Sequence, residues 1–185
     1  MTRRRSPDPA ERSRLLDAAA ALAGTTAWHD VTASRIVRAA KVAATRFRVH
    51  FRDVGTWLAA AQQRFMDGIR DRIVARTGTL PPGFERLRAA SEIYLDGCLA
   101  QNELRRWLIE ARGALPGLAD GLERQNQVYV MVMTPEFARL GWPHPAAAAQ
   151  LYLAMLMEAG VVESTAGRAV ADVRETLWDF LRIQQ

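Results

Sequence analysis

The densest group of chemically active side chains lies in residues 42–51, which read VAATRFRVHF. Arg46, Arg48 and His50 alternate with other residues there, and Arg52 follows directly. Guanidinium groups donate paired hydrogen bonds to phosphates and to the O6 and N7 acceptors of guanine. So much basic charge around a short apolar-cored segment predicts a surface for a polyanion.

Positive charge is concentrated near the start of the chain. Residues 1–52 hold 11 basic and 4 acidic side chains and carry +7, whereas the remainder holds 14 basic and 16 acidic ones and carries −2. A basic head on a nearly neutral body indicates nucleic acid, here double-stranded DNA, as the partner. A merely solvated basic surface is the alternative interpretation.

Apolar residues recur at helical spacing along most of the chain, and no segment alternates as a strand would. Asp8 as cap, Pro9 at the first helical position and Glu11 as the partner in a capping box predict the start of the first helix. Gly24 ends it, and Thr32 caps a second helix. The chain therefore opens with two short helices.

A third helix is expected over residues 44–51, after a tight turn at residues 41–42. At about 100° per residue, Ala44, Phe47 and Phe51 share one side, which would pack on the first two helices. The arginines are then left facing outward. Two short helices joined by a tight turn, the second basic on its outer side, predict a helix-turn-helix, which inserts its second helix into the major groove.

Six further helices complete an all-α fold of about nine helices. Their expected ranges are from residue 54 to a loop at 77–83, then 84–100, 103–112, 118–134, 146–163 and 169–183. The seventh is expected to end before Pro135. The apolar run at 145–162 contains Gln150 and Glu158, which favours a buried helix and no membrane span.

Enzymatic chemistry is not expected. The chain has three scattered histidines, one cysteine (Cys98), no metal-ligand spacing, no glycine-rich phosphate loop and no nucleophile motif. We therefore expect no catalytic site, metal or cofactor. A single cysteine excludes an intrachain disulfide, and no apolar stretch follows the basic N-terminus as in a signal peptide, so a cytoplasmic location is expected.

Three stretches, RLLDAAAALAG, VTASRIVRAAKVAATRFRVHF and VGTWLAA, resemble the N-terminal domain of the tetracycline-repressor (TetR) family of bacterial transcriptional regulators. The residues on the family pattern are Thr32, Ile36, Ala40, Val42, His50 and Phe51. Departures from it include Lys41 at the family's glycine, Ala43 at its serine cap and Arg48 at its tyrosine.

The resemblance implies a helix-turn-helix DNA-binding domain over residues 1–53 and a helical effector-binding and dimerisation domain over residues 54–185. It places the DNA contacts at Arg4, Arg5, Thr32, Ser34, Thr45, Arg46, Arg48 and His50. Among these we expect Arg46 at a base edge and Arg48 and His50 at phosphates. A structural role for His50 and a disordered charged arm at the N-terminus are the alternatives.

The helix AAAAQLYLAMLMEAGVVE (146–163) is apolar almost all round and needs cover on both faces. The resemblance implies that it joins a homodimer through the last two helices. It also implies a repressor that binds a palindromic operator and is released by a small apolar or amphipathic inducer. A helix buried inside a monomer is the alternative for the dimer face.

Candidate inducer-binding residues are aromatic and polar side chains on helix faces. They are Phe65, Tyr94, Trp107, Glu110, Asn126 and Tyr129. Plain core packing is the alternative for each of them. For the whole protein, an architectural or co-regulator role that uses the same DNA-binding head without a ligand is the alternative.

Overall fold

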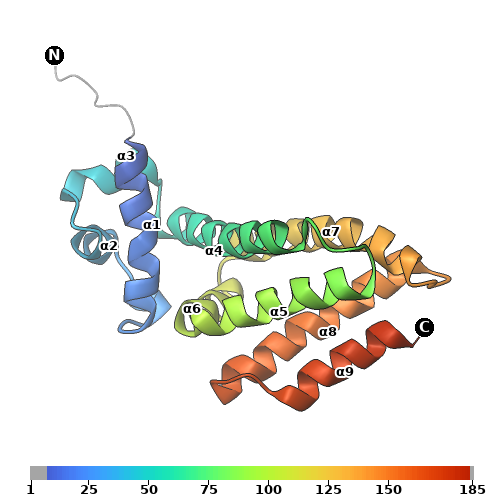
Figure 1. Ribbon diagram of the computed structural model, residues 1–185. Helices are drawn as coiled ribbons and strands as arrows, with labels where there is room; N and C mark the ends of the chain where they lie inside the picture. The colour runs from blue at the N-terminus through green and yellow to red at the C-terminus, as the bar shows by residue number, and fades with distance from the viewer. Residues whose placement is uncertain (1–7, 184–185) are drawn as a thin grey trace. The chain divides into compact units, whose positions relative to one another are not determined.

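The computed structural model describes residues 8–183 and divides the chain into two compact units. All regular structure in this described part is helical, so the all-α prediction is confirmed (Figure 1). Unit 1 consists of Met1–Phe65 and Glu103–Gly121; unit 2 consists of Met66–Asn102 and Leu122–Gln185. The expected boundary of roles between residues 53 and 54 stays a prediction.

Unit 1 contains a small helical head, residues 8–53. The elements of unit 1 are α1 (Pro9–Ala23), the 3₁₀ turn η1 (Trp28–Asp30), α2 (Ala33–Ala39), the 3₁₀ turn η2 (Ala44–Arg46), α3 (Phe47–His50), the first half of α4 (Val54–Thr77), most of α6 (Asn102–Arg112) and the start of α7 (Pro116–Arg139). The sequence placed the main helices here to within a few residues.

The head is held by one apolar core and by the predicted caps. The Asp8 carboxylate accepts the Ala10 N–H at 2.9 Å, and Thr32 Oγ1 accepts the Arg35 N–H at 3.3 Å, so both predicted caps are confirmed. The indole N–H of buried Trp57 donates to the carbonyl of Leu15 at 2.8 Å, which fixes the start of α4 to the middle of α1.

The predicted third helix is only partly an α-helix. It begins as η2 and becomes α-helical at α3, and Ala43 provides no side-chain cap at its start. Phe47 and Phe51 are buried as predicted, whereas Ala44 is exposed, so its predicted inward position was wrong. The 3₁₀ turn changes the angle per residue, which moves Ala44 off the aromatic face.

Lys41 makes the turn before this segment with φ of 54°, the left-handed region where glycine is the usual residue. Its neighbour Val42 donates its N–H to the carbonyl of Val37 at 3.0 Å. The family's glycine at this place therefore has a conformational reason, and lysine adopts the same conformation here at a cost.

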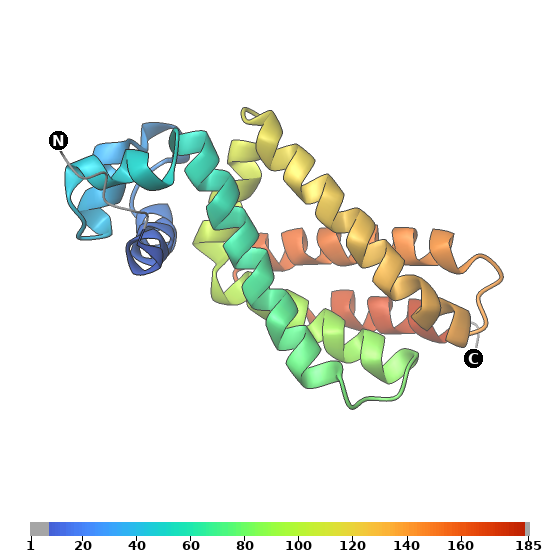
Figure 2. The same ribbon diagram turned by 90° about the horizontal axis from the view of Figure 1, so that it is seen from above.

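Unit 2 is built around α8. Its elements are the second half of α4, α5 (Phe84–Ala100), the remainder of α7, α8 (Pro145–Ala166) and α9 (Ala171–Arg182). Within this unit α8 packs against both α5 and α9, and α9 runs antiparallel to it (Figures 1 and 2). The fully buried Glu163 of α8 accepts from Arg174 of α9 at 2.7 and 2.9 Å, and Arg174 also reaches Asp96 of α5 at 2.9 Å.

Helix α7 continues through Pro135, so its predicted end before this proline was wrong. Proline lacks the N–H that would bond the carbonyl of Met131, but Met131 and Pro135 are both exposed, so water can satisfy that carbonyl. The next turn is fixed by Glu136, which accepts the Gly83 N–H at 2.6 Å and pairs with Arg86 at 3.0 Å. Tertiary contacts therefore override the helix-breaking residue.

Helix α8 is long and apolar enough to cross a membrane by length and composition, and no other helix in residues 8–183 is. In unit 2 one side of α8 is covered by α5 and α9. The other side exposes apolar residues, among them Leu151 at 62%. The expectation that α8 spans no membrane stays a prediction.

Candidate nucleic-acid interface and ligand pockets

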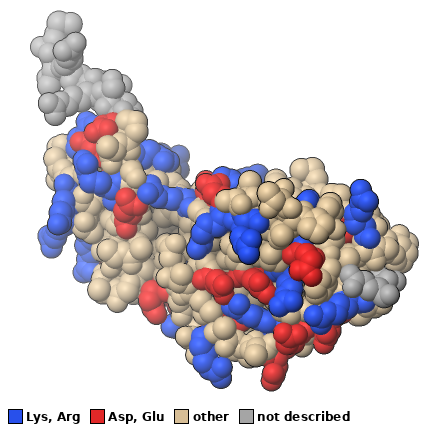
Figure 3. Space-filling view, viewed as in Figure 1, with Lys and Arg blue, Asp and Glu red and all other residues tan. Residues whose placement is uncertain are grey.

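Exposed basic side chains surround the helix-turn-helix of the head. They are Arg35, Arg38, Lys41, Arg48 and Arg52. Figure 3 shows Lys and Arg side chains over the head, with fewer acidic ones among them. Thr32 and Ser34 at the start of α2 and Thr45 in η2 are also exposed, so these predicted contacts lie on the surface with Arg48.

Two predicted DNA contacts are turned towards an acidic residue of α1. Glu11 Oε2 lies 2.5 Å from both Nε and Nη2 of Arg46 and 3.3 Å from Nε2 of His50. The side chain of Arg46 is 13% exposed and that of His50 is 0% exposed. The expectation that Arg46 faces outward was wrong. The side chain of Glu11, expected to complete a capping box at the start of α1, instead contacts Arg46 of η2 and His50 of α3.

The Glu11 contacts have an electrostatic signature. The hydrogen bond from Arg46 lowers the pKa of the Glu11 carboxyl below its ordinary value; burial opposes this, and the contact with His50 adds to it. Glu11 is therefore ionised at neutral pH, and its negative charge competes with any acceptor that Arg46 would meet on DNA.

The aromatic side of α3 anchors this arrangement. Phe47 and Phe51 lie with ring centroids 5.7 Å apart, and the guanidinium of Arg12 from α1 lies 5.3 Å from the Phe51 ring. Because α1 contributes both this cation and Glu11, it fixes the orientation of α3 in the head. The predicted arm residues Arg4 and Arg5 lie outside the described residues.

The predicted inducer-binding residues do not meet in one pocket. Trp107 and Glu110 border a pocket of unit 1 beside Gly24 at the end of α1. Asn126 borders a groove between α7 and α8. Phe65 is a buried core residue of unit 1.

Tyr94 and Tyr129 line a third site, which we call the α4–α5–α7 pocket and which encloses about 230 Å³ within unit 2. Its walls are residues from three helices over a floor from α8: Arg70, Ile73, Val74, Ala90, Ser91, Tyr94, Val128, Tyr129, Val132, Met133, Leu153 and Leu156. Three of these residues, Val74, Val128 and Val132, are exposed and mark where the pocket opens to solvent. A concave, mainly apolar site of this kind is typical of small-molecule binding.

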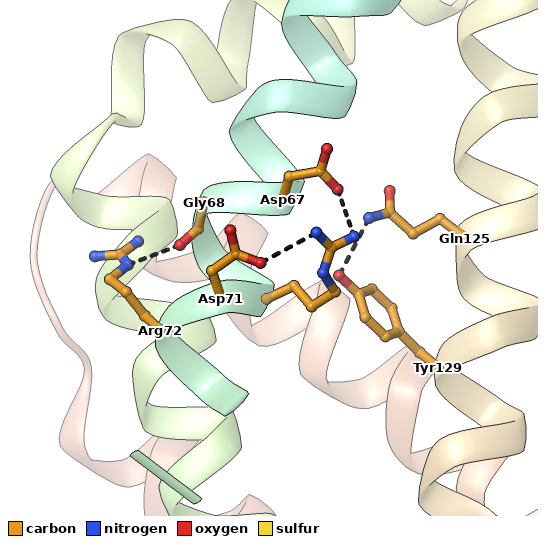
Figure 4. A network of polar contacts seen from close by, with 7 residues as sticks. Asp67, Gly68, Asp71, Arg72, Gln125 and Tyr129 are labelled. Atoms are coloured by element: carbon orange, nitrogen blue, oxygen red, sulfur yellow. Dashed lines mark hydrogen bonds and ion pairs between the residues drawn. The ribbon is translucent and has the colours of Figure 1, made fainter. Parts of the chain in front are cut away.

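Two sets of polar groups lie beside this pocket, one on α4 and one on α7 (Figure 4). Arg70 pairs with Asp67 at 2.6 Å and with Asp71 at 3.1 Å. Gln125 donates to the hydroxyl of Tyr129 at 3.2 Å, and burial raises the pKa of that tyrosine.

Sequence reasoning missed Glu11 and Arg70 as site residues. Glu11 is one of only four acidic residues in a basic segment, which was an available signal, but its partners are 35 and 39 residues away. Arg70 lies beside aspartates at positions −3 and +1, a pattern common on solvated helices. Among residues 8–183 no group of three His, Cys, Asp or Glu side chains could hold a metal ion.

Comparison with solved structures identifies the class of fold. The chain matches, at a TM-score of 0.80 and 16% identity over 94% of its length and 97% of the other chain, a protein from Rhodococcus sp. named as a TetR-family transcriptional regulator. The fatty acid degradation regulator FadR of Bacillus halodurans matches at 0.76, with 16% identity over 97% and 96% of the two chains.

A regulator from Saccharomonospora viridis, solved in complex with choline, matches at 0.72 with 22% identity over 93% and 95% of the two chains. No protein-family profile and no curated protein matches the sequence. The chain therefore has the fold of TetR-family regulators across both of its units, at identities that show the fold alone.

Proposed function

We propose that this protein is a cytoplasmic, DNA-binding transcriptional regulator of the TetR type that acts as a homodimer. The observation that carries the proposal is the exposed basic surface on a helix-turn-helix, in a chain whose whole fold is that of such regulators. In our proposal it represses by binding a palindromic operator and is released by a small-molecule inducer. It has no enzymatic activity.

DNA contact is assigned to the exposed residues of the head first. Thr45 of η2 reaches the groove and Arg48 of α3 contacts a phosphate beside it, while Thr32 and Ser34 contact phosphates at the start of α2, where the helix N-terminus favours an anion. Arg46 reaches a base edge only by exchanging the Glu11 carboxylate for a DNA acceptor. His50, the last residue of α3, has a buried side chain that contacts Glu11 of α1, and it reaches a phosphate only if α3 shifts.

Dimerisation is assigned to the uncovered side of α8 with α9. Leu151, Val161 and Val162 of α8 and Ile183 just after α9 are exposed apolar residues of unit 2. A second copy related by a two-fold axis would cover the same surface on both partners and present two heads to a near-palindrome.

The mass measured by light scattering after gel filtration tests this assignment and should be that of a dimer. Leu151→Glu places a charge in the proposed interface and should give the mass of a monomer. Val132→Glu places the same charge on α7, outside the proposed interface, and should leave the dimer intact.

The inducer role rests on the α4–α5–α7 pocket, because an architectural protein has no need of an apolar cavity. An inducer must bind the DNA-incompetent arrangement more tightly than the competent one, since equal affinity for both shifts nothing. The architectural alternative predicts that no ligand of this pocket changes DNA affinity.

Binding of the full chain to a fluorescein-labelled duplex of about four helical turns tests the DNA-binding proposal. Arg48→Ala should weaken binding about tenfold and make the slope of log K against log salt shallower by about 2, for one lost phosphate contact in each head. Arg168→Ala, which removes an exposed arginine after α8, is the matched control and should change little. Equal effects of the two substitutions, or no binding at 50 mM salt, would contradict the proposal.

A further inference from the structure

The apolar walls of the α4–α5–α7 pocket offer a ligand little to hydrogen-bond. Ile73 and Val74 of α4, Val128 and Val132 of α7 and Leu156 of α8 present only hydrocarbon. Removing such surface from water is the main favourable term for a ligand that matches it.

The polar groups on the lining already have partners within the protein. Ser91 Oγ donates to the carbonyl of Leu87 at 2.8 Å and lies 2.8 Å from the hydroxyl of buried Tyr152. The Tyr129 hydroxyl accepts from Gln125. Among these groups the Tyr129 O–H still has its proton to donate, so a ligand with several polar atoms would leave most of them unpaired, which costs binding free energy.

The one cation on the lining is outnumbered by carboxylates. Arg70 directs its guanidinium at Asp67 and Asp71, at 2.6 and 3.1 Å, and both contacts raise its pKa (Figure 4). The three groups together carry one negative charge. An anionic head would therefore meet a neutralised arginine and two aspartates, which is unfavourable for a carboxylate, phosphate or sulfonate.

The volume limits the size of the occupant. A cavity of about 150 Å³ lined by apolar side chains accommodates benzene, and this pocket encloses about 230 Å³. A fused bicyclic ring or a branched hydrocarbon of about ten carbons fits such a space. Larger ligands would extend past the exposed valines into solvent.

From these features we infer that the α4–α5–α7 pocket binds an uncharged, mainly hydrocarbon molecule with a core of about ten carbon atoms, and selects against anions of the same shape. The inference rests on the proposed function only in calling this molecule the inducer. Hydrophobic burial supplies the affinity, and the Asp67–Arg70–Asp71 cluster supplies the discrimination.

A matched pair of fluorescent probes tests the discrimination directly. N-phenyl-1-naphthylamine is uncharged, and 1-anilinonaphthalene-8-sulfonate is the same ring system with a sulfonate. With the purified full chain and no DNA, the uncharged probe should bind at least tenfold more tightly. In competition, 1-decanol should displace it at least tenfold better than decanoate and no worse than decyltrimethylammonium. Equal or tighter binding of the sulfonate, or clearly better displacement by either ion, would overturn the inference.

Variants locate the probe and test the role of the carboxylates. Val132→Trp at the pocket opening should weaken the uncharged probe at least tenfold, whereas Met131→Trp, equally exposed on the same helix but outside the lining, should change it less than twofold. The double substitution Asp67→Asn and Asp71→Asn should tighten sulfonate binding several-fold by leaving Arg70 uncompensated. Indifference to Val132→Trp would show that the probe binds elsewhere and would refute the site; an unchanged sulfonate affinity would refute the role of the carboxylates.

The two proposals fail separately. Probe binding with the expected charge preference but no DNA binding would leave the pocket assignment intact and remove the inducer role. DNA binding without selective probe binding would leave the regulator intact and refute this pocket.

Discussion

The contact between Glu11 and Arg46 makes a prediction about DNA affinity that is the reverse of an ordinary interface mutation. Glu11 Oε2 lies 2.5 Å from two nitrogens of Arg46, whose side chain is 13% exposed. A DNA phosphate or guanine must displace that carboxylate to bind the same guanidinium. Glu11→Gln replaces the anion by a neutral amide and should therefore strengthen DNA binding.

The expected size follows from counting charges. In the proposed dimer the substitution frees one guanidinium group in each of the two heads, and each is counted as one added charge contact with DNA. At about 0.9 released counterions per phosphate contact, the slope of log K against log salt should steepen by about 1.8, and affinity at 0.1 M salt should rise about tenfold. The gain falls short of the full electrostatic value because glutamine still accepts a hydrogen bond from Arg46.

Fluorescence anisotropy with a labelled duplex between 50 and 300 mM KCl measures both quantities. Glu85→Gln, an exposed site on α5, makes the same change in net charge and is the control. Adding Arg46→Ala to Glu11→Gln should abolish the gain, since the gain depends on that side chain. If Glu11→Gln binds no better than Glu85→Gln, or more weakly, then Glu11 does not compete with DNA and the reasoning is refuted.

Three further predictions concern stability. Lys41→Gly should raise the free energy of unfolding by about 0.5–1 kcal/mol, because φ of 54° is strained for lysine and not for glycine. In the same urea titration the control Ala39→Gly, which lies in helical backbone, should lower the free energy of unfolding by about 1 kcal/mol. Hydrogen bonds at the start of α4 hold the pKa of the Asp53 carboxyl at about 2, below its ordinary 3.8. The ionised carboxylate therefore stabilises the folded protein fully above about pH 4, and this contribution should be lost as the pH falls from 4 to 2. Urea unfolding followed by circular dichroism should show that Asp53→Asn lacks this pH-dependent loss. Glu163→Gln should cost about 3 kcal/mol, because it leaves the buried cationic charge of Arg174 poorly compensated. Glu123→Gln at an exposed site on α7 should cost under about 0.5 kcal/mol, and equal effects of the two at one fixed protein concentration would show that the buried pair contributes little.

Helix positions were predictable because each depends on local pattern. The spacing of apolar residues placed α4 and α5 to the residue or nearly so, and Asp8 and Thr32 marked two helix starts correctly. The end of α7 was not predictable, because Glu136 binds Gly83 and Arg86, which are 53 and 50 residues away in the sequence. Local rules describe what a residue prefers, and distant partners decide whether the preference is followed.

The site was predictable in location but not in detail. Charge density indicated the head, and Thr45 and Arg48 are exposed there as expected. The inward turn of Arg46 depends on a carboxylate from another helix, which a wheel of one helix cannot show. The ligand residues were chosen one helix at a time, and the six are spread over different places: Tyr94 and Tyr129 share the α4–α5–α7 pocket, whereas Trp107 and Glu110 share a pocket of unit 1.

Selection of bound duplexes from a random library tests the central claim most directly. The full chain, incubated with random-sequence DNA at 0.1 M salt and recovered through several rounds, should enrich an inverted repeat whose half-sites lie about one helical turn apart or a multiple of it. Enrichment of sites without two-fold symmetry, or none above the starting library, would contradict a dimeric, sequence-reading regulator.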